Sequence, residues 1–154
     1  MHAAIVISRQ GPLFYWNVDH AVGKNGVNKF EDVLFVQWCL YKLVRHAPQQ
    51  APHVLDKLKL VGLNGNCNGR ETDPLVEGIK ALQQSLNLVV DGRVSSVPTG
   101  ASHYREAGGK SVFLILYPLN ATLAQMHPAQ WPRIDLMPDF VWQIKDKATA
   151  PFSM

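Results

Sequence analysis

Residues 64–99 read NGNCNGRETDPLVEGIKALQQSLNLVVDGRVSSVPT and contain one short pattern twice. Asn64-Gly65 is followed by Thr72, and Asp91-Gly92 is followed at the same interval by Thr99. Asn or Asp before Gly is typical of a tight turn, because the short side chain bonds nearby backbone and Gly accepts a positive φ. The chain therefore repeats one kind of turn on either side of a single intervening segment.

That intervening segment predicts a helix over about 74–87. Its apolar residues recur at the spacing of one helical face: Leu75, Ile79, Leu82 and Leu86. Asp73 is placed to cap the helix, and Pro74 takes the first helical position, where its missing N–H costs nothing.

A second helix is predicted over about 29–45. Asn28 followed by Glu31 resembles a capping box at its start. Apolar residues continue at helical spacing: Val33, Val36, Leu40 and Leu43. Trp38, Cys39 and Tyr41 widen the apolar face, which predicts burial on more than one side and a core position for Trp38. A short helix is expected over 53–60.

The terminal segments predict strands. Residues 5–7 and 13–16 suit a hairpin or two edge strands, and 22–26 suits a loop. Residues 111–117 predict a buried strand, Asn120 a helix cap, and 140–144 either a strand or a helical turn. The expected fold is α+β and mainly helical, a single domain over 1–154 with a small sheet from the terminal segments.

The repeated unit, from Asn28 to Thr99, resembles the peptidoglycan-binding repeat of bacterial cell-wall proteins. The matching residues are Val36-Gln37 and Leu82-Gln83 for two Gln-bearing helix positions, Asn64-Gly65 and Asp91-Gly92 for two Asp-Gly turns, and Gly69 and Thr72 for the intervening Gly and Thr. Asn64 stands where the family has Asp, Leu82 where it has Phe, and each turn carries one extra residue before its Thr. The resemblance implies a helical core over 28–99, with 100–154 as an extension of unknown role.

Two roles are open for the turn residues. On the structural reading the turn residues only shape the backbone, which includes Asn64 and Asp91 as well as Gly65, Gly69, Thr72, Gly92 and Thr99. The resemblance implies a shallow groove near the turns, with Asn64, Arg70, Asp91 and Arg93 as ligand-binding residues. There the two arginines and the start of the 74–87 helix would pair with stem-peptide carboxylates.

Composition narrows the class of partner. The 154 residues are 47% apolar and 18% charged, enough apolar material for a core. A net charge of +3 without a Lys or Arg stripe argues against nucleic acid. No stretch approaches the roughly 18 apolar residues of a membrane span. The N-terminal residues lack the pattern of an export signal, so we expect a cytoplasmic protein, one exported by a signal-independent system, or a periplasmic one whose signal was removed.

Residues for catalysis or cofactors are not indicated. The six histidines have no metal-ligand spacing, and Cys39 and Cys67 match neither a zinc nor a redox motif. We interpret Cys39 as a buried thiol and Cys67 as incidental, with a disulfide left open. Neither GxSxG nor a transpeptidase-type cysteine signature is present. No catalytic residue, metal or cofactor is therefore predicted.

Two functions follow. The first is a noncatalytic module that recognises peptidoglycan. The second is a protein–protein adaptor, chaperone or immunity-type partner in a bacterial secretion or antagonism system, which reuses the scaffold. Exposed aromatic residues would then form the interface, although core packing is the alternative for each: Tyr104, Trp131 and Trp142. A small wall hydrolase ranks last.

Overall fold

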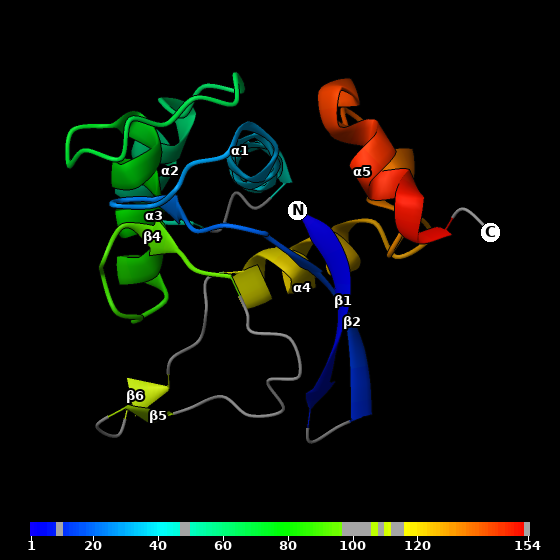
Figure 1. Cartoon of the computed structure of the whole chain (residues 1–154). Helices are drawn as coiled ribbons and strands as arrows, with labels where there is room; N and C mark the ends of the chain where they lie inside the picture. Colours follow the sequence, from blue (N-terminus) through cyan, green and yellow to red (C-terminus); the bar gives the residue numbers. More distant parts are fainter. Residues whose placement is uncertain (9–10, 47–49, 97–105, 108–109, 112–115, 153–154) are drawn as a thin grey trace.

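The computed structural model describes residues 1–8, 11–46, 50–96, 106–107, 110–111 and 116–152. Its elements are the strands β1 His2–Ser8, β2 Gly11–Asn17, β3 Val22–Gly23, β4 Arg93–Val94, β5 Glu106–Ala107 and β6 Lys110–Ser111, the helices α1 Phe30–His46, α2 Pro52–Lys59, α3 Pro74–Ser85, α4 Leu116–Met126 and α5 Lys145–Thr149, and the 3-10 turns η1 Ile134–Leu136, η2 Trp142–Ile144 and η3 Ala150–Phe152. This α+β, mainly helical architecture confirms the predicted class (Figure 1).

Helix α1 runs through the middle of the molecule. Every residue from Val33 to Leu40 is buried, as the wide apolar face predicted. The helix contacts α2 and β3 as well as α4 and the η2 turn. Elements from both the first and the second half of the chain therefore pack against this one helix. Burial of Lys42 within it, at 0% exposure, lowers the pKa of its ammonium group.

The predicted cap at Asn28 is wrong. Asn28 lies at φ +54° and turns its side chain away from the helix, into the preceding loop. Its Oδ1 accepts from the Gly23 N–H at 2.7 Å, and its Nδ2 donates to the carbonyls of Gly23 and Gly26. The first helical bond instead runs from the Val33 N–H to the Lys29 carbonyl. Asn28 therefore closes the 23–28 loop, whose backbone groups its side-chain amide bonds in place of those at the helix start.

Helices α2 and α3 confirm the predicted elements at 53–60 and 74–87 and pack against each other. The Asp73 carboxylate caps α3, with its Oδ1 accepting from the Leu75 N–H at 2.9 Å, and Pro74 begins the helix. Five of the side chains that α3 buries come from its predicted apolar face or its flank: Leu75, Val76, Ile79, Leu82 and Gln83.

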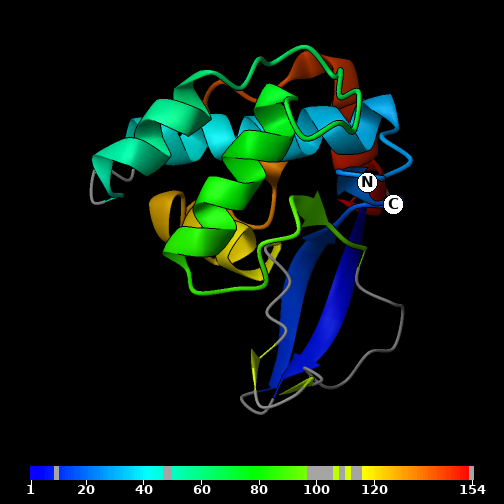
Figure 2. The same ribbon diagram turned by 90° about the vertical axis from the view of Figure 1, so that its left-hand side faces the viewer.

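The predicted N-terminal hairpin is confirmed. Strands β1 and β2 pair antiparallel from His2 opposite Asn17 to Ser8 opposite Gly11. The hairpin extends away from the helices (Figure 2). At its inner end Trp16 is buried, and the Asn120 side chain bonds both its N–H, at 2.7 Å, and its carbonyl, at 2.9 Å.

Asn120 was expected to cap a helix, and this expectation is wrong. It lies inside α4, which begins at Leu116. Its side-chain amide makes the two hydrogen bonds to the Trp16 backbone that a neighbouring strand would otherwise make. The predicted strand over 111–117 also fails at its carboxyl end, where Leu116 and Tyr117 form the first turn of α4; residues 112–115 lie outside the described residues. Pro118 is compatible with that first turn, since a proline there removes no helical hydrogen bond.

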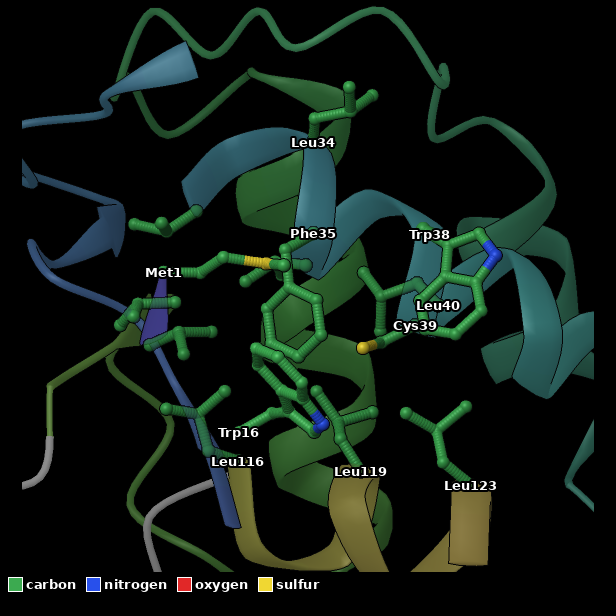
Figure 3. Packing of buried hydrophobic residues seen from close by; sticks show 14 of the residues in the cluster. Met1, Trp16, Leu34, Phe35, Trp38, Cys39, Leu40, Leu116, Leu119 and Leu123 are labelled. Carbon is green, nitrogen blue, oxygen red and sulfur yellow. The ribbon is translucent and has the colours of Figure 1, made fainter. Parts of the chain in front are cut away.

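The core lies between α1, α4 and the open end of the hairpin, where Met1 and Trp16 are found. Trp16 and Phe35 meet the leucines of α4 there, with Met1 and Cys39 beside them (Figure 3). The segment 137–140 is attached to the other side of α1. Trp38 donates from Nε1 to the Asp139 carbonyl at 3.0 Å, and Lys42 donates to the Pro138 carbonyl at 3.1 Å. Of the alternatives for 140–144, the helical turn is the observed one.

Candidate functional site

The first Asn-Gly turn is held by the side chain of Gln37 from α1. Gln37 Oε1 accepts from the backbone N–H groups of Asn64 and Gly65, at 3.0 and 2.8 Å. Its Nε2 donates to Asn64 Oδ1 at 3.2 Å and to the Asn66 carbonyl at 3.0 Å. Gln37 is itself buried, so this Gln clamp replaces water around the turn with four directed bonds.

The second turn is held in the same way by Gln83 from α3. Gln83 Oε1 accepts from the Gly92 N–H at 2.8 Å, and Nε2 donates to Asp91 Oδ1 at 2.7 Å and to the Arg93 carbonyl at 3.1 Å. Gly65 and Gly92 both adopt positive φ, +72° and +70°. The two turns thus share a backbone conformation, and each is bonded by a glutamine from a helix. The repeat seen in the sequence is therefore also a repeat in the structure.

A helix residue seven positions before each Gln covers the turn glycine. A Cβ at Gly65 would lie 2.2 Å from the Phe30 ring, and one at Gly92 would lie 2.9 Å from Val76 Cγ1. Both glycines therefore face helix side chains that leave no room for a larger residue. Phe30 remains 43% exposed, so the first turn has an apolar border that the second, covered by buried Val76, lacks.

The loop after β3 joins the second turn to the Asn68-Gly69 pair that follows the first turn. The Lys24 N–H donates to the Gly92 carbonyl at 2.9 Å, and the Asn25 N–H donates to the Gly69 carbonyl at 3.4 Å. Consecutive residues of one loop thus bond the glycines that immediately precede Arg93 and Arg70. The backbone at these two arginines is therefore brought close together, although 23 positions separate them in the sequence.

Charged groups surround this junction. Glu71 pairs with both Lys24 and Lys80, which neutralises much of their charge. In the described part of the chain neither Arg70 nor Arg93 forms an ion pair, and the buried Arg93 Nε has no hydrogen-bond partner. Arg70 is exposed and Arg93 is half-buried. These two guanidinium groups are available to an anion.

The start of α3, by contrast, already carries a carboxylate. Asp73 is buried and accepts from the Asn68 N–H through Oδ2 at 2.7 Å and from the Leu75 N–H through Oδ1. A capping carboxylate satisfies the helix N–H groups and its dipole. An incoming carboxylate would meet this negative charge, which restricts the predicted anion site to the arginines.

The remaining predicted residues are spread over the molecule. Thr72 is exposed, just before the Asp73 cap, whereas Thr99 and Tyr104 lie outside the described residues. Trp131 is half-buried and makes an edge contact with Phe14, its ring centroid 6.2 Å away. Trp142 is 78% exposed, the largest exposed fraction among the exposed apolar side chains of the described chain.

The two cysteines are free thiols. Cys39 is buried and Cys67 is half-buried, and burial raises the pKa of both. Across the described ranges no three His, Cys, Asp or Glu side chains gather as metal ligands. No described helix has the length and apolarity needed to cross a bilayer.

Sequence reasoning missed the function of the two glutamines and the Lys24–Glu71–Lys80 ion pairs. A signal for the glutamines was present, since Gln37 and Gln83 are polar residues within otherwise apolar helix faces. Lys42, in an apolar run of α1, carried the same kind of signal. A polar side chain on a buried helix face needs a hydrogen-bond partner. For these three residues the partner is a turn or loop packed against the helix.

Comparison with models of protein families, with curated proteins and with solved structures gave no match to this chain. The resemblance to the peptidoglycan-binding repeat therefore stays a prediction from the sequence.

Proposed function

We propose that this protein is a noncatalytic module that recognises bacterial peptidoglycan at the place where the loop after β3 bonds the Asp91-Gly92 turn and the Asn68-Gly69 pair. The observation that supports it is the bonding of Lys24 and Asn25 to Gly92 and Gly69, which brings Arg93 and Arg70 together. Arginine forms bidentate hydrogen bonds with carboxylates, and stem peptides carry such groups.

Two further polar groups lie in the turns that precede these arginines in the sequence. Asn64 and Asp91 are exposed at equivalent turn positions. Their inner oxygens are bonded by the glutamines, whereas the Asn64 Nδ2 and Asp91 Oδ2 atoms have no hydrogen-bond partner within the described residues. The surface thus offers an amide donor at one turn and a carboxylate acceptor at the other, which would orient an amide-containing ligand. On this proposal the protein meets its ligand in the cell wall.

The test is cosedimentation of the purified protein with intact peptidoglycan sacculi at physiological salt, where weak electrostatic adsorption is screened. We expect the wild-type protein to pellet and the Arg70→Ala and Arg93→Ala variants to pellet less. Lys147→Ala is the matched control, because it removes one exposed positive charge from α5, outside segment 28–99. Pelleting that is equally insensitive to all three changes would disprove the site.

A second candidate, a protein–protein adaptor, chaperone or immunity-type partner in a bacterial secretion or antagonism system, is favoured by Trp142. A tryptophan 78% exposed is costly in water and is enriched where proteins meet. A photo-crosslinking amino acid at position 142, compared with one at the exposed position Lys147, tests this in the bacterial cell. A single defined adduct formed only from position 142, together with failure of the protein to pellet with sacculi, would place this function first.

A further inference from the structure

The chain contains three Asn-Gly dipeptides, at 25–26, 64–65 and 68–69. In such a pair the glycine backbone nitrogen can attack the asparagine side-chain carbonyl carbon, because glycine has no side chain to hinder the approach. Whether the attack occurs in a folded protein depends on how the two groups are held.

Asn64-Gly65 and Asn68-Gly69 form nearly the same turn. Asn64 Oδ1 accepts from the Asn66 N–H at 3.0 Å, and Asn68 Oδ1 accepts from the Arg70 N–H at 2.8 Å. The following glycines have φ of +72° and +71°. Both asparagines are exposed. Backbone conformation and exposure of the asparagine therefore do not distinguish the two pairs, although Gly65 is buried and Gly69 is half-buried.

The Gln37 clamp does distinguish them. It engages both reacting groups of the first pair, the Gly65 N–H at 2.8 Å and Asn64 Oδ1 at 3.2 Å. In the second pair, within the described residues, the Gly69 N–H faces only the sulfur of Cys67, a weak acceptor. The other bonds of this turn leave both reacting groups free, because they run from the Asn68 N–H to Asp73 and from the Asn25 N–H to the Gly69 carbonyl. The third pair is also held, because the Gly26 N–H donates to the Gly23 carbonyl at 3.0 Å and Asn28 bonds the Gly26 carbonyl.

We propose that Asn68 is a site of spontaneous deamidation and that the Gln37 clamp protects the otherwise equivalent Asn64. The Gly69 nitrogen loses its proton to solvent and bonds to Cγ of Asn68. The Cγ–Nδ2 bond then breaks, and ammonia leaves with a proton from water. A second water molecule opens the resulting cyclic imide at either carbonyl and gives aspartate or isoaspartate at position 68. Only water is consumed, and the turn that carries Arg70 gains one negative charge.

The experiment is incubation of the purified protein in mildly alkaline buffer, followed by tryptic digestion and mass spectrometry. Cleavage after Lys59 and Arg70 releases both asparagines in one peptide, 60–70. Electron-based fragmentation locates the change and separates aspartate from isoaspartate. We expect Asn64 to convert at least about tenfold more slowly than Asn68, because the clamp must open first. The synthetic peptide 60–70, in which no clamp exists, should convert at both positions at similar rates.

Two variants test the protecting role. Gln37→Leu should accelerate conversion at Asn64 to about the rate at Asn68, which means a gain of about tenfold or more. Gln83→Leu is the matched control, because it removes a clamp of the same kind from a turn that contains no Asn-Gly pair. Equal rates at Asn64 and Asn68 in the folded wild-type protein would overturn the proposal. Equal acceleration at Asn64 by both variants would also overturn it, because the protection would then come from the stability of the whole fold and not from the Gln37 clamp.

Discussion

Replacing Gln37 by leucine should destabilise the fold far more than an ordinary helix substitution. Leucine fills a similar volume and suits the helix, so the variant removes hydrogen bonds without opening a large cavity. What is lost is the set of four bonds to Asn64, Gly65 and Asn66. The buried Gly65 N–H would then face an apolar side chain.

The magnitude follows from these bonds. A net hydrogen bond contributes about 0.5–1.5 kcal/mol, and an orphaned buried donor costs about 1–3 kcal/mol. Because one side chain makes all four bonds, their energies do not add fully. We expect the free energy of unfolding to fall by about 2–4 kcal/mol, which corresponds to a drop in Tm of roughly 4–16 °C for a chain of this size.

The assay is urea unfolding followed by tryptophan fluorescence, with the midpoint compared at a constant m value. Gln83→Leu should give a loss of similar size, since it removes three equivalent bonds. Gln84→Leu is the control, an exposed neighbour on the same helix, and should change stability by less than about 0.5 kcal/mol. If Gln37→Leu proves no more harmful than Gln84→Leu, the clamp does not stabilise the turn and our reasoning is refuted.

Other expected outcomes concern the supporting structure. Asn120→Leu removes both bonds to Trp16 and should lower the free energy of unfolding by about 2–4 kcal/mol in the same urea assay; an unchanged midpoint would contradict this. The two hydrogen bonds from Arg133 lower the pKa of Asp135, so their stabilisation is present above the ordinary carboxyl pKa and is lost as pH falls through the lowered value. Arg133→Gln should raise that pKa in an NMR titration, and a titration curve identical to that of the wild type would refute the assignment. Gly23→Ala should lower the free energy of unfolding by about 2–4 kcal/mol, because φ is +98° and the new Cβ would lie 2.3 Å from the Gly92 carbonyl oxygen. The measurement is thermal unfolding, and a Tm equal to the wild-type value would contradict this expectation.

Local signals in the sequence predicted the helices well. The Asp73 cap and the apolar spacing around Leu75 and Val33 involve contacts within a few residues, and these are readable from the chain alone. The hairpin at 2–17 was readable for the same reason. The failure at Asn28 is local, because its side chain bonds the loop before it and not the helix after it. The failure at Asn120 involves a contact distant in sequence. Asn120 bonds Trp16 across 104 positions, which no local pattern reports.

The predicted strand at 111–117 failed for a related reason. A short apolar run is compatible with a buried strand or a buried helix, and its period alone does not separate them. Leu116, Leu119 and Leu123 share one buried face of α4, and this face becomes evident only once α1 and Trp16 are placed opposite it (Figure 3).

The candidate site was predictable in its turns and less so in its arrangement. The Asn-Gly and Asp-Gly pairs indicated where the backbone reverses. That Lys24 and Asn25 connect the Asp91-Gly92 turn to Gly69 depends on a loop far away in the sequence. The helix start was expected to receive ligand carboxylates, and the Asp73 cap that the sequence itself predicted is the reason why it does not suit them.

Because of the Gln clamp, the geometry of each turn does not depend on how many residues lie between the glutamine and the turn. Gln37 and Asn64 are 27 positions apart, with all of α2 between them, whereas Gln83 and Asp91 are only 8 apart. The same bonds form in both cases because the glutamine recognises the turn and not the connection. Lengthening the segment between Leu88 and Asp91 should therefore cost little beyond loop closure, about 0.6 kcal/mol for each doubling of the loop length, because the N–H groups of residues 86–88 still close the end of α3. This makes that segment the natural place to insert a foreign peptide or a second domain, with the Asp91 turn as a fixed point of attachment.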